Sequence, residues 1–212
     1  MQKNSMLCLL ILIATMLIAI VQSSASNAII GFTRFFALEG FMLLCVALLI
    51  GPLSLFFPKI AHLIEPRRTV GISAFVFIAA HVYMVISQYF SFDLTMIFTE
   101  TTFIIGLIAF LITLIITITS CDYALKHLKQ KKWKAIQRLA YIVFILVLVH
   151  FIVRSMLLKT GQADIAEIAI TLLAIITIIM QFAGFIKKRK ISKKLAFSQM
   201  HTTKQVTEQK QN

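Results

Sequence analysis

Stretches of about 20 apolar residues recur along this chain and limit what it can fold into. A helix needs about 20 mainly apolar residues to cross a membrane. Six stretches meet this requirement, at residues 6–22, 35–56, 71–90, 101–119, 138–158 and 165–186. Lipid offers no water to unpaired backbone groups, so such spans are helices. We therefore expect an all-α, polytopic membrane helix bundle with six transmembrane helices.

Little sequence remains for any other domain, because 59% of the 212 residues are hydrophobic. We expect one transmembrane helical domain over residues 1–190. Residues 191–212 are rich in Lys, Gln and Thr, which predicts a disordered cytoplasmic tail. Residues 1–28 have a second interpretation. Lys3, an apolar run and the segment SSASNA also fit a signal peptide, whose cleavage would leave five spans.

Basic residues are concentrated in alternate connections between the spans. The net charge is +13, and the Lys and Arg residues cluster at 59–68, 126–134 and 187–194. The remaining connections, at 23–34, 91–100 and 159–164, carry only Arg34 and Lys159. Positive residues mark cytoplasmic loops, which predicts cytoplasmic N- and C-termini. The charge thus indicates a membrane-lipid surface, and no nucleic-acid partner is expected.

Two histidines lie deep within predicted spans, His81 in GISAFVFIAAHVYMVIS and His150 in YIVFILVLVHFIVRS. Ionisable residues inside a membrane are costly and mark candidate functional sites. His81 follows Arg68 by 13 residues, and His150 follows Gln137 by the same number, which places each about 20 Å along its helix. Two neutral imidazoles at one level on parallel helices could hold a haem iron between them. Alternatively, each His hydrogen-bonds to a neighbouring helix as a polar contact.

Other charged residues have two interpretations each. Arg154 lies one turn beyond His150, where it could pair with a haem propionate or extend toward the membrane interface. Arg68 and its neighbour Arg67 either anchor a helix at the cytoplasmic face or contact an anionic cofactor. Glu39, inside the second span, is a proton or quinone contact or else an interfacial or paired carboxylate.

The sequence lacks the common nucleotide-binding and metal-binding motifs, which restricts where electrons for a redox centre could come from. The sequence has no GxGxxG, GxxxxGK[ST], HExxH or CxxC pattern, so no nucleotide motif is present. Any electrons for a haem would come from a separate protein or a membrane carrier. His62 and His127 lie in predicted cytoplasmic connections, where we expect them to face solvent.

Three segments carry a resemblance to a known family: LEGFMLLCVALLIGPLSLFF, RRTVGISAFVFIAAHVYM and TSCDYALKHLKQKKWKAIQRLAYIVFILVLVHFI. Their landmarks are Pro52, Arg68, His81, Trp133 and His150. Over residues 32–159 the chain resembles the ferric-reductase-like transmembrane domain, and specifically the MsrQ (YedZ) haem-binding subunit.

The resemblance implies a haem b electron-transfer subunit of the bacterial inner membrane, with His81 and His150 as axial haem ligands. Relatives of this kind take electrons from a cytoplasmic flavin reductase or the quinone pool, and FMN is a further cofactor that the resemblance allows. They pass the electrons to a periplasmic molybdopterin enzyme, MsrP, a methionine sulfoxide reductase. The family's inner His corresponds to Gln137, a poor haem ligand. We therefore expect one haem.

Two alternatives stay open. The chain could be a component of a ferric-chelate reductase, which would use a different electron acceptor. It could also be a non-redox transporter or a structural membrane subunit. Transporters more often have broken helices at mid-membrane, and the scarcity of Gly and Pro in these spans counts against that class.

Overall fold

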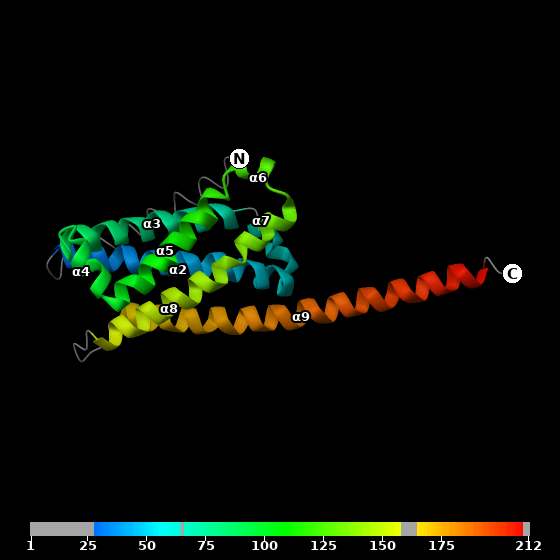
Figure 1. The fold of residues 1–212 in the computed structure, drawn as a ribbon. Coiled ribbons are helices and arrows are strands. Elements are labelled where there is room, and N and C mark those ends of the chain that lie inside the picture. The colour runs from blue at the N-terminus through cyan, green and yellow to red at the C-terminus, as the bar shows by residue number, and fades with distance from the viewer. Residues whose placement is uncertain (1–27, 65, 158–164, 210–212) are drawn as a thin grey trace.

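The part of the chain that the structure describes is helical throughout. The computed structural model describes residues 28–64, 66–157 and 165–209, and these contain no strand (Figure 1). The elements are α2 (Ala28–Phe56), the 3-10 helix η1 (Pro58–Ile64), α3 (Arg67–Gln88), α4 (Leu94–Thr99), α5 (Thr101–Ile118), α6 (Asp122–His127), α7 (Gln130–Gln137), α8 (Leu139–Leu157) and α9 (Ile165–Gln209).

Five helical segments are long and apolar enough to cross a membrane. They are Ile30–Phe56, Arg67–Gln88, Thr101–Ile118, Gln130–Arg154 and Ile165–Leu195. They coincide with five of the six predicted spans, so the predicted all-α membrane bundle is confirmed and the chain is a multi-pass membrane protein. The predicted span at 6–22, like the alternative of a signal peptide, lies outside the described residues.

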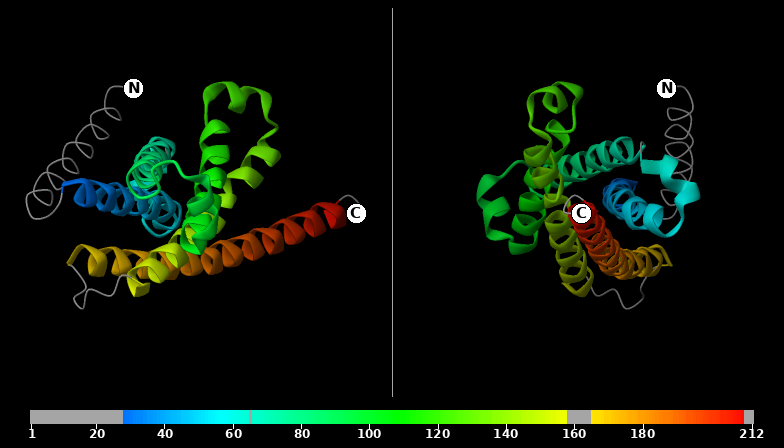
Figure 2. Two further views of the ribbon diagram at one scale, coloured as in Figure 1. Left: turned by 60° about the vertical axis from the view of Figure 1, so that its left-hand side comes forward. Right: turned by 90° about the vertical axis from the view of Figure 1, so that its right-hand side faces the viewer.

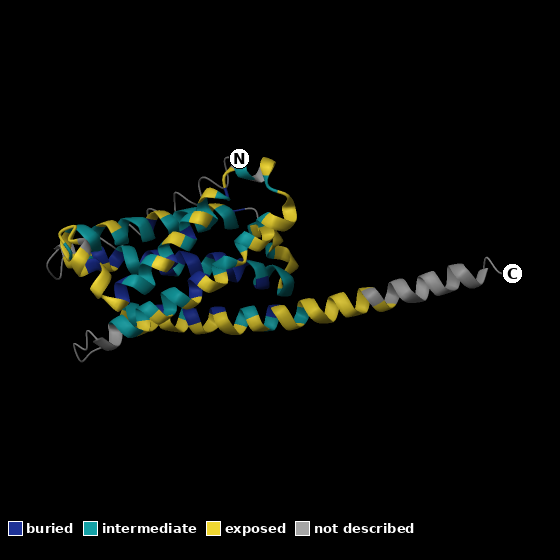
Figure 3. Cartoon of the chain, in the orientation of Figure 1, coloured by how far each residue is buried: buried dark blue, intermediate teal, exposed yellow. Residues whose placement is uncertain are grey.

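Helix α2 forms the centre of the bundle. It is the one span of the five that is mostly buried, and its side chains supply half of the buried core cluster (Figure 3). Helices α3 and α9 pack along it, whereas α8 packs chiefly along α5 (Figure 2). Phe41 links the two groups, because its ring lies 5.8 Å from the ring of Phe144 and 6.1 Å from that of Phe151.

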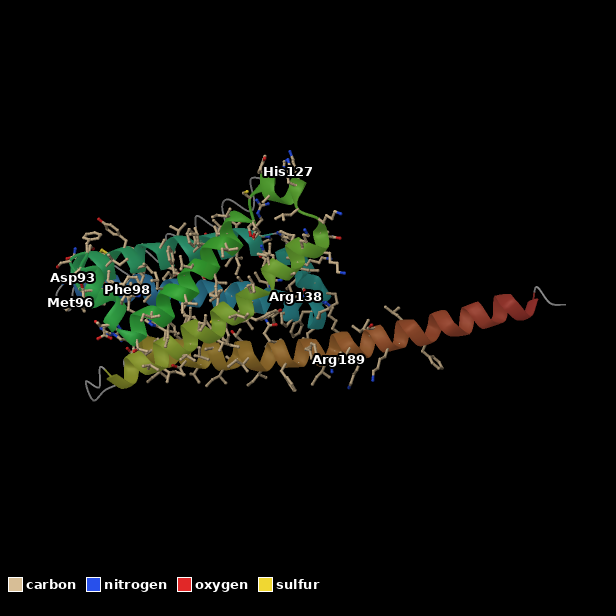
Figure 4. The ribbon with its side chains drawn as sticks, viewed as in Figure 1. Asp93, Met96, Phe98, His127, Arg138 and Arg189 are labelled. Carbon is tan, nitrogen blue, oxygen red and sulfur yellow. The ribbon has the colours of Figure 1, made fainter. Side chains whose placement is uncertain are left out.

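The two ends of the bundle differ in charge. We call the end at which α4 connects α3 to α5 the α4 end, and the opposite end, with η1 and α7, the η1 end (Figure 1). Asp93, Met96 and Phe98 lie at the α4 end, whereas Arg138 lies toward the η1 end and Arg189 farther along α9 (Figure 4). The basic clusters predicted from the sequence are therefore gathered away from the α4 end.

Pro52 lies inside α2, yet the helix continues to Phe56. Proline has no N–H, so the carbonyl of Leu48 loses its usual partner within the helix. Nε2 of Gln181, on α9, donates to that carbonyl at 2.6 Å. One residue earlier, Nε of Arg67 on α3 donates to the carbonyl of Ala47 at 2.8 Å. Neighbouring helices thus stabilise the turn that the proline weakens.

The connection between α5 and α8 contains two short helices, α6 and α7. Helix α9, however, runs on to Gln209 and projects past the other helices, where the composition of 191–212 predicted disorder (Figure 1). A helix already formed in the membrane needs only one further hydrogen bond per added residue, without a new nucleation step.

Candidate functional site

The imidazole of His81 is oriented by helix α2. Its Nδ1 lies 3.0 Å from the carbonyl oxygen of Thr33. This contact depends on the close approach of α2 and α3, because Gly40 has no side chain where a Cβ would lie 2.8 Å from Cγ1 of Ile78. A carbonyl oxygen only accepts hydrogen bonds, so Nδ1 is the protonated nitrogen. In the neutral ring Nε2 is then left with its lone pair, ready to bind a metal.

The imidazole of His150 is oriented in the same way by helix α5. Its Nδ1 donates to the carbonyl of Thr102 at 2.7 Å. The ring lies so close to α5 that a Cβ on Gly106 would be 3.2 Å from both Cε1 and Nδ1. Gly106 lies one turn after Thr102, and its lack of a side chain leaves room for the ring of His150 to reach the Thr102 carbonyl. Nε2 of His150 is likewise left without a proton.

The two histidines lie toward the same end of the bundle. Thr33 and Thr102 both belong to the first turns of helices that begin at the α4 end. Their hydrogen bonds therefore fix both imidazoles at that end, in agreement with the predicted common depth. His150 is close enough to His81 to act on its charge, and Arg154 acts on both rings. The structure thus brings all three predicted residues into one neighbourhood.

Arg154 places a positive charge near the two imidazoles. Its side chain is half-buried and makes no hydrogen bond or ion pair with any residue that the structure describes. A guanidinium that is partly removed from water favours an anionic partner, and its planar fork suits a carboxylate. An anionic group bound between the two imidazoles would therefore be stabilised by Arg154.

This arrangement fits a haem better than a bare metal ion. In the described residues no group of three His, Cys, Asp or Glu side chains could hold a metal ion. Two imidazoles with open Nε2 atoms, carried by α3 and α8, could hold a haem iron, which would supply one-electron redox chemistry. Arg154 could pair with the carboxylates of such a group. These residues therefore fit a haem.

Gln137 takes part in a different contact, toward the η1 end. Its Nε2 donates to Oγ of Ser120 at 2.9 Å and has a longer contact of 3.5 Å with the carbonyl of Ile116. The amide therefore joins the end of α7 to the end of α5, and its nitrogen already has a hydrogen-bond partner.

Arg68 is not brought to the histidine pair. It lies in the first turn of α3, about 20 Å along the helix from His81, so an anionic group that it binds would lie at the η1 end. His62 and His127 are exposed, as expected, and their Nδ1 atoms bond to the carbonyls of Lys59 and Tyr123.

Two buried polar atoms lack partners among the described residues. Oε1 of Glu39 and Nε1 of Trp133 are inaccessible to solvent and make no hydrogen bond there. Glu39 was expected either as a proton or quinone contact or as an interfacial or paired carboxylate. The residue is only 6% exposed and its Oε1 has no partner among the described residues, which argues against both the interfacial and the paired interpretation.

Sequence reasoning missed the residues that orient the histidines. Gly106 offered a signal, since it is the one glycine of α5. Thr33 and Thr102 offered none, because they act through backbone carbonyls that every residue possesses.

Comparison with known proteins identifies the family. Residues 36–148 match the family model described as ferric reductase like transmembrane component, which includes His81 and ends two residues before His150. The chain is also similar to magnetosome protein MamZ of Magnetospirillum gryphiswaldense, with 28% identity over 137 residues. That alignment covers 62% of this chain but 21% of MamZ, so the chain spans about a fifth of this relative's length. Because the family model matches more than half of the sequence, the chain belongs to the ferric reductase-like transmembrane component family.

Proposed function

We propose that this protein binds one haem b, with His81 and His150 as axial ligands, and transfers electrons across the membrane. The observation that carries the proposal is the matched pair of imidazoles, each with Nδ1 bonded to a carbonyl and Nε2 open. When bound there, a haem supplies a one-electron redox centre.

The surrounding residues would position this centre. The carbonyls of Thr33 and Thr102 hold each ring in one orientation and make Nε2 a stronger ligand. Arg154 would pair with a propionate. The apolar spans on either side would keep water away from the iron, which favours electron transfer over side reactions.

We infer that the protein binds a single haem, and the reason lies at the η1 end of the bundle. Gln137 is a poor ligand, and its amide is already bonded to Ser120. The basic clusters favour a cytoplasmic η1 end, cytoplasmic termini and a bacterial inner membrane location. Electrons would then enter from a cytoplasmic flavin reductase or the quinone pool. An anionic donor cofactor such as FMN would be attracted to Arg68 at that end.

The electron acceptor has two candidates. By its resemblance to MsrQ the chain would serve a periplasmic molybdopterin reductase that repairs oxidised methionines. The matched family description favours ferric chelates as the second candidate. The two are separated by supplying the reduced protein with either acceptor and following haem reoxidation.

The deciding experiment is the dithionite-reduced minus oxidised absorption spectrum of the detergent-purified protein, with haem quantified per chain. We expect a b-type signal at one haem per chain, and its loss in His81→Ala and in His150→Ala. His62→Ala and His127→Ala are matched controls on exposed histidines and should keep the signal. A protein without haem, from cells supplied with haem precursor, would refute the proposal and favour a transporter or structural subunit.

A further inference from the structure

Glu39 is a buried carboxyl group that the proposed electron transfer does not use. It lies in the middle of α2, its side chain is 6% exposed, and Oε1 has no hydrogen-bond donor among the described residues. An ionised carboxylate without a partner is destabilised in an apolar interior, and a nearby positive charge favours the ionised form. Such a group therefore takes up a proton when that positive charge is removed.

Most charged and titratable groups on the helices around α2 have partners other than Glu39. On α3, His81 bonds to the carbonyl of Thr33 and Arg67 to that of Ala47. On α9, Lys187 bonds to the carbonyl of Leu55 and Glu167 pairs with Arg34, and on η1 His62 bonds to the carbonyl of Lys59. On α8, His150 and Arg154 lie near His81. None of these groups donates a hydrogen bond to Oε1 of Glu39.

Glu39 is carried by the same helix that orients His81. It lies six residues after Thr33 on α2, which is about 9 Å along the helix axis. Thr33 is the residue whose carbonyl holds His81. Two unit charges about 12 Å apart, at an effective dielectric constant of about 20, change each other's proton affinity by about tenfold. A change of charge at the iron would therefore be felt at this carboxyl group.

We propose that Glu39 binds a proton when the haem held by His81 and His150 is reduced, and releases it on reoxidation. In the reductive step one electron from a quinol or a reduced flavin converts ferric to ferrous iron. One proton from water forms an O–H bond on the Glu39 carboxylate, so the buried charge is unchanged overall. This coupling rests on the proposed haem site.

The test is the pH dependence of the haem midpoint potential. One proton taken up per electron lowers the potential by about 59 mV for each tenfold fall in proton concentration. Because the coupling is about tenfold, we expect the wild-type potential to fall with rising pH by about 59 mV in total, with a steepest slope of about half of 59 mV per pH unit. Glu39→Gln, which keeps the size of the side chain but cannot ionise, should have a potential that is independent of pH. Glu167→Gln is the matched control, since it removes a partly exposed carboxylate of α9 and should keep the wild-type slope.

The possible outcomes distinguish proton coupling at Glu39 from the proposed haem site on which it rests. A wild-type protein with a haem signal but a flat potential, or an unchanged slope in Glu39→Gln, would overturn proton coupling at Glu39 and leave the haem site intact. A protein without haem would instead remove the proposed function. If Glu39→Gln fails to fold, redox-difference infrared spectra of the wild type decide the question. They should contain a carboxyl C=O band on reduction that shifts in D2O, and its absence would contradict the proposal.

Discussion

The contact between His150 and Gly106 allows the sharpest test of the site. In Gly106→Ala the new Cβ would lie 3.2 Å from Nδ1 and Cε1 of the ring, closer than the 3.5–4.0 Å that carbon atoms prefer. The ring would have to move by a few tenths of an ångström, away from α5. That movement lengthens the 2.7 Å hydrogen bond to the Thr102 carbonyl and turns Nε2 away from the iron position.

The size of the effect follows from the role of that hydrogen bond. Loss of an outer partner of a metal-binding His typically weakens metal affinity by about 10–100-fold. The helix itself should gain from the same change, because Ala is favoured over Gly inside a helix by about 0.5–1 kcal/mol. Gly106→Ala should therefore bind haem more weakly without any loss of helix stability. A lower haem affinity together with an unchanged or higher stability distinguishes an effect on the position of His150 from a general destabilisation of the protein.

The assay is titration of the haem-free protein with haem, together with the unfolding temperature of each variant. Gly71→Ala is the control, since it makes the same change on α3, where no atom lies within 4 Å of the added Cβ. It should keep the wild-type haem affinity. A Gly106→Ala variant with wild-type affinity and an unchanged midpoint potential would show that the ring of His150 is not held against α5 as described.

Three further predictions concern packing and charge. Gly40→Ala places a Cβ 2.8 Å from Cγ1 of Ile78 and 3.2 Å from its backbone nitrogen, so α2 and α3 must separate at a cost of about 1–3 kcal/mol, visible as a lower unfolding temperature. Gln181→Leu removes the donor to the Leu48 carbonyl and should cost about 1–3 kcal/mol; an unchanged unfolding temperature would mean that this carbonyl needs no partner. Arg154→Gln should lower the haem midpoint potential, because a positive charge about 10 Å away favours the added electron by about 1–2 kcal/mol. Arg154→Lys keeps the charge and should retain most of the potential.

The positions of the spans could be predicted because they depend on local properties. Length and apolar composition decide whether a segment can cross a membrane, and five predicted spans agree with the structure. The common depth of His81 and His150 was also accessible, since residues along a helix advance by a fixed rise.

The state of each polar side chain depended on contacts between helices and could not be read from the sequence. The same sequence spacing would allow His150 to face lipid, another helix or a cofactor, and only the packing of α5 against α8 brings it to Gly106 and the Thr102 carbonyl. Gln137 could have pointed toward α3, but the structure directs its amide to Ser120.

Sequence by itself therefore determined that this chain is a helical membrane protein with two histidines at one depth, because span length, apolar composition and helix rise are properties of consecutive residues. Tertiary structure decided which nitrogen of each imidazole is free, that Arg154 stands beside both rings and that Oε1 of Glu39 is buried without a donor. Those features arise from atoms about 50 residues or more apart in the chain or from burial in the bundle, and the physical reason is that rotation of each helix about its axis is set by packing against its neighbours.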